Sequence, residues 1–238
     1  MTKNGTDPSA RMGLVLAALA LTTFMGSCAL TQREALTSQN YCAFLGSNLC
    51  AKLTPGSSGQ FDLRYVNPNA QWSQYSKVLI SPVTFWAGDN TTLSAADQQL
   101  LTNYLFSALQ QQLSQKFQVV NEPGPGVMTV QVALDDATSA TPGLRSISLV
   151  EPHARALATL KYLSTGTYPF VGSAQAEGKA IDSVTGQVLA AAVSKRVGGG
   201  SVQAADQWQW GDAENALTYW AQKITNQLAS WTSGGATS

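Results

Sequence analysis

Apolar residues recur along this chain with two different periods, and these periods predict where helices and strands lie. Leucine stands at every fourth position over residues 101–113, which is typical of the buried face of a helix. Ser94 can cap the first turn of that helix, and Asp97 follows three residues later, as in a capping box with Asp in place of Glu. We therefore expect a helix that begins just after Ser94.

Apolar segments with strand-like patterns lie at 77–86, 117–120 and 127–134. Pro82 interrupts the first of them, which favours a bulge or an edge position, because proline cannot donate to a strand ladder. The sequence NEPGPG at 121–126 separates the other two, so we expect these two segments to form a hairpin.

A second hairpin is predicted from strands at 173–182 and 187–196, because Asp182 and Gly186 are typical turn residues. Small residues occupy alternate positions of its first strand: Ala174, Ala176, Gly178 and Ala180. A face with such small side chains either admits a helix at close range or leaves a shallow groove.

Two more helices complete the pattern. Pro152 is suited to a first helical position, and the following residues place three leucines on neighbouring turns: Leu157, Leu160 and Leu163. Asp212 is expected to cap the last helix, which buries an apolar face. The predicted order is strand, helix, strand, strand, helix, strand, strand, helix, which indicates an α+β fold with helices packed on one face of a mostly antiparallel sheet.

The length of 238 residues suits one domain with an N-terminal extension. Four segments are expected: a signal peptide at 1–27, a lipidated N-terminus and tether at 28–60, a single α+β domain at 61–231, and a disordered tail at 232–238. Within the tether, Phe44, Leu45 and Leu49 suggest a short piece that docks on the domain.

The net charge of the chain excludes one way of attracting partners. Without residues 1–27 the chain keeps 12 of its 14 basic and 13 of its 14 acidic residues, a net charge of −1. Such a balance does not attract nucleic acid or an anionic membrane surface.

The first residues carry Lys3 and Arg11 and lead into an uncharged apolar segment at 12–25. That segment is shorter than the ~20 residues that span a bilayer as a helix, and it is typical of a secretory signal. Its end, Met25-Gly26-Ser27-Cys28, resembles the lipobox of bacterial lipoproteins, although Met25 replaces the usual Leu. The resemblance implies cleavage after Ser27 and acylation of Cys28, palmitate included. Ala29, which is not Asp, implies sorting to the outer membrane of a Gram-negative cell envelope, on its periplasmic side.

Three cysteines are an odd number for an exported protein, and lipidation of Cys28 would leave Cys42 and Cys50. These two either form a local disulfide, which an oxidising periplasm permits, or stay reduced and buried. A metal site is not expected, because two cysteines without a nearby histidine lack the usual four ligands.

Candidate catalytic residues are few. His153 is the single histidine, and the chain holds no G-x-S-x-G elbow, so we expect a surface histidine and no enzyme activity. Asp135 and Asp136 form an acidic pair, but neighbours on a strand point to opposite faces, so we interpret them as polar residues that end a strand.

Aromatic residues offer one candidate for a partner or ligand surface: Trp72, Tyr75, Trp86, Trp208 and Trp210. Tryptophan and tyrosine often anchor protein or glycan contacts. The alternative is that Trp72 and Trp210 fill the ends of the core.

Several short motifs together resemble a family of bacterial lipoproteins known as domain of unknown function 3313. They are RYVNP at 64–68 with Trp72 and Tyr75, the strand at 78–83, PGPG at 123–126, DSVTGQVLAA at 182–191, and WGDA at 210–213. The resemblance covers about residues 40–230 and implies export and lipidation, without an established activity or cofactor. Our hypothesis is a non-catalytic outer-membrane lipoprotein, held by its lipid, that docks as an accessory or structural subunit on an unknown partner in a periplasmic envelope complex. The alternative is a carrier lipoprotein that binds lipid or peptidoglycan fragments at the small-residue face.

Overall fold

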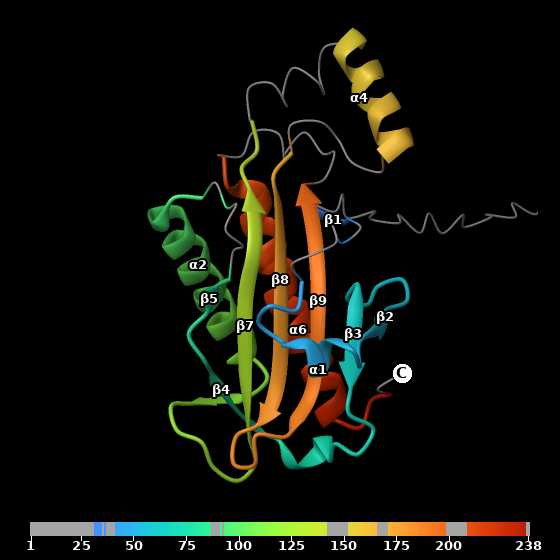
Figure 1. Ribbon diagram of the computed structural model, residues 1–238. Helices are drawn as coiled ribbons and strands as arrows, with labels where there is room; N and C mark the ends of the chain where they lie inside the picture. Colours follow the sequence, from blue (N-terminus) through green and yellow to red (C-terminus); the bar gives the residue numbers. More distant parts are fainter. Residues whose placement is uncertain are drawn as a thin grey trace, which may run out of the picture.

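A mixed, mostly antiparallel sheet forms the centre of the protein, as expected (Figure 1). The structure, a computed structural model, describes residues 31–34, 36, 41–86, 91, 93–141, 152–165, 171–198 and 209–236. The strands in this part of the chain are β1 (Thr31–Arg33), β2 (Thr54–Pro55), β3 (Leu63–Val66), β4 (Lys77–Ile80), β5 (Thr84–Phe85), β6 (Gln118–Val120), β7 (Val127–Thr138), β8 (Ser173–Asp182) and β9 (Val188–Gly198). The helices are α1 (Ser47–Cys50), η1 (Trp72–Gln74), α2 (Ala95–Leu113), α4 (Pro152–Thr165) and α6 (Gly211–Thr232).

The strand order of the sheet is β2-β3-β9-β8-β7-β4-β6, and in addition β1 pairs with β9 and β5 pairs with β7. The three longest strands, β7, β8 and β9, are neighbours in its centre. The predicted hairpin of β8 and β9 is confirmed. Asp182 Oδ1 accepts hydrogen bonds from the backbone N–H groups of Val184 and Thr185, and Gly186 takes a φ of 73°, which glycine adopts without strain.

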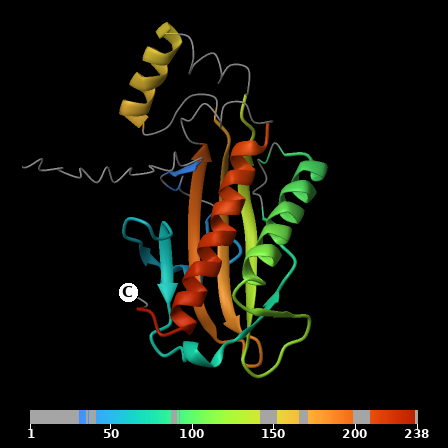
Figure 2. The same cartoon turned by 180° about the vertical axis from the view of Figure 1, so that it is seen from behind.

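Helices α2 and α6 lie side by side across one face of the sheet (Figure 2). The predicted leucine stripe of α2 is confirmed, since Leu101, Leu105, Leu109 and Leu113 are all fully buried. The predicted cap is confirmed as well: the backbone N–H of Asp97 donates to the hydroxyl of Ser94 at 3.1 Å.

Helix α6 covers the small-residue face of β8. Ala174, Ala176 and Ala180 are buried in one core with residues of α6, among them Trp220 and Leu228. The prediction that Asp212 caps α6 is wrong, because the helix begins at Gly211 after Trp210. Asp212 instead sits in the first turn, where its carboxylate accepts the backbone N–H of Gly172 at 2.8 Å.

The other face of the sheet carries the N-terminal part of the described chain. Leu45 and Leu49 pack against Ala191 and Val193 of β9, so the expected docking piece is present, with α1 inside it. The segment expected to be a tether also supplies strands: β1 pairs with β9, and β2 pairs with β3. Residues 31–33 and 54–55 therefore belong to the folded unit.

The predicted hairpin of 117–120 with 127–134 is wrong. Strands β6 and β7 both run parallel to β4, which lies between them. The segment 121–126 therefore leads from one side of β4 to the other. Pro82 does interrupt the strand predicted at 77–86, which is divided into β4 and β5 along the same edge of β7.

Candidate functional site at the N-terminal junction

The described aromatic residues of the predicted surface do not come together on the outside of the protein. Cys28 and Trp208 lie outside the described residues. Trp72, Tyr75 and Trp210 are buried in the core, whereas Trp86 is 45% exposed.

Each buried aromatic has a structural role. The Trp72 ring lies 4.7 Å from the ring of Trp231, centroid to centroid, and Trp210 Nε1 donates to Asp97 Oδ1 at 3.0 Å, which joins the N-terminal ends of α6 and α2. Tyr75 donates to Asp182 Oδ2 at 2.9 Å, and its burial together with this bond raises the pKa of Tyr75 to about 12.

A junction between β1 and the sheet is the first element of the candidate site. Thr31 and Arg33 pair with Gly198 and Arg196 at the end of β9. Arg196 adds side-chain contacts, because its guanidinium donates to the carbonyl of Thr31 at 2.9 Å and lies 3.8 Å from the ring centre of Tyr219 on α6. The strand that follows the predicted lipidation site is therefore bonded to β9 along its backbone and, through Arg196, connected to α6.

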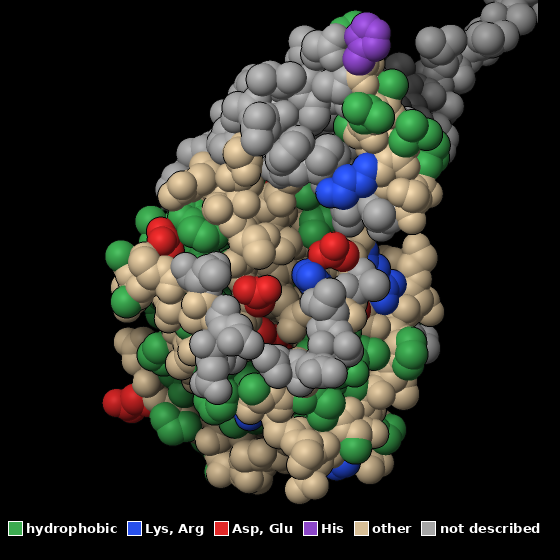
Figure 3. All heavy atoms as spheres, turned by 45° about the horizontal axis from the view of Figure 1, so that its top comes forward, with side chains coloured by type: hydrophobic (Ala, Val, Ile, Leu, Met, Phe, Trp, Pro, Cys, Tyr) green, Lys and Arg blue, Asp and Glu red, His purple; other side chains and the backbone are tan. Residues whose placement is uncertain are grey.

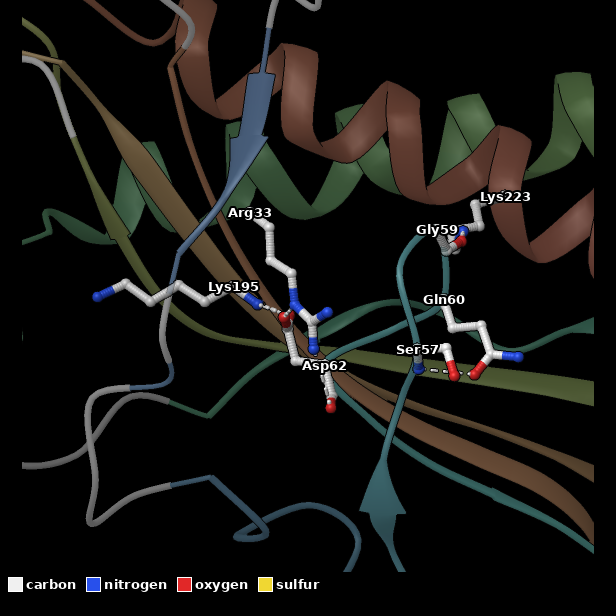
Figure 4. Close-up of polar contacts among 7 residues, drawn as sticks. All are labelled: Arg33, Ser57, Gly59, Gln60, Asp62, Lys195 and Lys223. Carbon is white, nitrogen blue, oxygen red and sulfur yellow. Dashed lines mark hydrogen bonds and ion pairs between the residues drawn. The ribbon is translucent and has the colours of Figure 1, made fainter. Parts of the chain in front are cut away.

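Asp62, just before β3, locks this junction. Its carboxylate accepts a hydrogen bond from Arg33 Nε and, at 2.9 Å, from the backbone N–H of Lys195 (Figure 4). The Lys195 ammonium also lies 3.1 Å from the carboxylate of Glu34. Asp62 is buried, and its bonds with Arg33 and with the Lys195 N–H compensate for removing its charge from water.

A disulfide loop is the second element. Cys42 and Cys50 are joined by a disulfide with 5.7 Å between their Cα atoms. Glu177 of β8 is only 1% exposed, and its two carboxylate oxygens accept the backbone N–H groups of Cys42 at 2.5 Å and Leu45 at 2.9 Å. This buried glutamate therefore fixes the loop on the sheet.

Asp135 and Asp136 lie on β7, beside the strand that carries Glu177. The expectation that Asp135 and Asp136 end a strand and point to opposite faces is wrong, because β7 continues to Thr138 and contains a bulge at this pair. The register moves from Leu134 opposite Ala176 to Asp136 opposite Gln175, so two residues stand where a regular strand has one. Both aspartates thus lie on the face opposite α2 and α6.

Asp135 is buried next to Glu177, and Gln175 Nε2 approaches its carboxyl at 3.4 Å. Burial first, and then the negative charge of Glu177, raise the pKa of Asp135 to about 8. Such a group can hold a proton at neutral pH. Both carboxylate oxygens of Glu177 accept hydrogen bonds from backbone N–H groups. Asp135 and Glu177 therefore serve the structure of the junction.

The sequence did not single out Asp62 or Glu177. A signal for Glu177 was present, since polar Gln175, Glu177 and Lys179 alternate with the small residues of β8 and so share the other face. No comparable pattern surrounds Asp62.

Other candidate chemistry is sparse in the described part of the chain. His153 is exposed on α4. Within the described residues no group of His, Cys, Asp or Glu is arranged to hold a metal ion, and no described helix is both long and apolar enough to cross a bilayer.

The small-residue face also bears on ligand binding. A cavity of about 80 Å³ remains there, lined by residues that include Ala176, Ala180, Trp220 and Leu228. Ligand pockets usually enclose ~300–1,000 Å³, so this cavity is small for a lipid or a glycan fragment.

Comparison with known proteins gives a family and distant relatives. The model of the family described as a protein of unknown function, DUF3313, matches residues 40–224. The chain is 24% identical to the uncharacterized lipoprotein YdcL of Escherichia coli K12 over 147 residues, which are 61% of this chain and 65% of that protein. The chain thus aligns with slightly less than two thirds of its relative.

Two solved structures are similar to this chain at low identity and low TM-score. One is the PelC dodecamer from Paraburkholderia phytofirmans, with 8% identity, a TM-score of 0.36, and coverage of 67% of this chain and 95% of that one. The other is the lipoprotein GNA1162 from Neisseria meningitidis, with 12% identity, a TM-score of 0.33, and coverage of 65% and 99%.

Proposed function

The chain belongs to the DUF3313 family, and from this premise we propose that it is an outer-membrane lipoprotein without catalytic activity, which docks on a periplasmic envelope complex as an accessory subunit. Cys28 carries the lipid, and the folded domain lies in the periplasm. The similarity to an uncharacterized lipoprotein supports the lipid anchor. The lipobox at 25–28 and Ala29 support the outer membrane.

The junction of β1 with β9 is the observation that carries this proposal. Cys28 precedes Thr31 by three residues, a span of at most about 11 Å even for extended chain. Because β1 is bonded to β9 and Arg33 to Asp62, the domain is attached to the membrane by a short connection. A domain held that closely is suited to act on a partner in or at the same membrane.

A small aromatic surface is the best candidate for contact with the partner. The exposed Trp86 stands edge-on to Phe44 of the disulfide loop, with 5.8 Å between ring centres. Lys179 lies 4.6 Å above the Phe44 ring. Tryptophan is among the residues that most often dominate binding at interfaces.

In-cell photocrosslinking tests the accessory role. A photoreactive residue at Trp86 is expected to give one recurrent protein adduct, identified by purification and mass spectrometry. The same residue at Asn226, exposed on α6, is the matched control and should give no such adduct. Equal, unspecific crosslinking from both positions would contradict a partner at this surface.

The carrier alternative has less support, since α6 fills the small-residue face of β8 and leaves only a small cavity. A lipid or glycan that copurifies in equal amount with the protein, without a protein partner, would favour it.

A further inference from the structure

Helix α4 presents its apolar side chains to the outside. Leu157, Leu160 and Leu163 are 68%, 61% and 74% exposed, whereas Ala158 is 2% exposed. At 100° per residue the three leucines span one face of about 120°, and Ala158 lies on the far side of the helix from its centre. Figure 3 shows hydrophobic side chains on the surface near the purple histidine of α4.

This orientation is the reverse of the usual one. A helix on the surface of a globular protein turns its apolar stripe towards the core and its small or polar residues outward. Three neighbouring leucines in water are unfavourable, so a face of this kind normally contacts another molecule.

The position of α4 in the fold indicates what that molecule is. α4 lies in the connection between β7 and β8, and these strands meet where Thr138 pairs with Ser173. Ser173 pairs in turn with Val197 of β9, and Val197 pairs with Gln32 of β1. One row of paired residues therefore joins the strand ends that carry α4 to the strand that follows Cys28.

We propose that the leucine face of α4 lies in the surface of the lipid bilayer to which Cys28 is attached. This inference rests on the proposed lipid anchor. The acylated cysteine is within about 11 Å of β1, so the end of the sheet that carries α4 faces the membrane at close range. An α-helix of 14 residues is about 21 Å long, which suits a helix that lies in the interface and does not span it. The anchor and the helix then hold the domain at two points.

Vesicle binding of the mature chain from residue 28, with Cys28→Ser to remove the lipid, isolates the contribution of α4. Flotation with vesicles of phosphatidylethanolamine and phosphatidylglycerol is expected to recover this chain. Replacing the three leucines by glutamine should lower partitioning about 100-fold, as expected when three half-buried leucines are lost. Val184→Gln is the matched control, because Val184 is 65% exposed at the opposite end of the sheet, and it should leave partitioning unchanged.

A fluorescent label distinguishes contact of the leucine face with the membrane from contact with a second copy of the protein. An environment-sensitive dye on Leu160→Cys should shift to the blue when vesicles are added, with the protein monomeric by sedimentation in their absence. Absence of vesicle binding by the unacylated chain would overturn the proposal, as would a dimer that forms through the leucine face. Circular dichroism of the glutamine variant confirms that it is folded.

The same variants separate this inference from the lipid anchor. Radiolabelled palmitate incorporated at Cys28 in the full chain reports the anchor alone. If Cys28 incorporates palmitate but the unacylated chain does not bind vesicles, only the proposal for α4 is contradicted. If the unacylated chain binds vesicles but Cys28 incorporates no palmitate, only the proposed lipid anchor is contradicted.

Discussion

Replacing Asp135 by asparagine is expected to stabilise the protein at alkaline pH and to flatten the dependence of its stability on pH. Burial and the neighbouring Glu177 raise the pKa of Asp135 from 3.8 to about 8. In the unfolded chain this carboxyl titrates near its ordinary value. Between the two values, the native protein keeps a proton that the unfolded chain has released.

The direction in which stability changes with pH follows from this difference in pKa. Because the pKa is higher in the native state, the stability it contributes is complete below about pH 4 and is lost as pH rises towards about 8. One pKa unit corresponds to about 1.4 kcal/mol, so the free energy of unfolding is expected to fall by a few kcal/mol, on the order of 3–5, over this window. Asparagine has the same shape and never carries the buried charge.

Urea unfolding at about pH 5 and about pH 9 measures both effects. The wild-type protein should lose several times more stability between the two values than Asp135→Asn. Asp136→Asn is the matched control, because Asp136 is the exposed neighbour on the same bulge. Its charge is the smallest of the causes that raise the pKa of Asp135, so this variant should keep most of the wild-type dependence. Equal pH dependence of wild type and Asp135→Asn would show that Asp135 does not keep a proton in the native protein.

Two further substitutions test the packing of the junction and of α6. Glu177→Ala leaves the backbone N–H groups of Cys42 and Leu45 without their acceptor. It should lower the free energy of unfolding, measured by urea titration, by about 2–4 kcal/mol. The exposed Glu122→Ala is the control, and an equal loss in both variants would contradict the role of Glu177. Gly198→Ala places a methyl group against the carboxylate of Asp212 and should lower the free energy of unfolding by about 1–3 kcal/mol, seen as a lower Tm. Gly124→Ala is the control, because Gly124 has open space around it, and it should have little effect. Equal Tm values of the two variants would contradict the close approach of Gly198 and Asp212.

Elements that depend on neighbours in the sequence were predictable. The leucine period and the Ser94 cap define α2 within a 20-residue window, and the Asp182–Gly186 turn defines the hairpin of β8 and β9. The small side chains of β8 were expected either to admit a helix or to leave a shallow groove, and the structure places α6 there.

Elements that depend on distant pairing were not predictable. The segment 121–126 looked like a hairpin turn because nothing local reveals that β4 takes the place between β6 and β7. The bulge at Asp135 changes which face two aspartates occupy, and it is set by the register with β8. Asp62 and Glu177 acquire their roles only when β1 and the disulfide loop fold back over more than 100 residues of chain onto β9 and β8.

The chemical state of Cys28 is the most direct test of the proposed anchor. Mass spectrometry of the N-terminal peptide from protein purified out of the cell envelope measures it. The proposed anchor requires a chain that begins at Cys28 and carries diacylglycerol on sulfur and an acyl group on its amino nitrogen. A chain that keeps residues 1–27, or one with an unmodified Cys28, would contradict it.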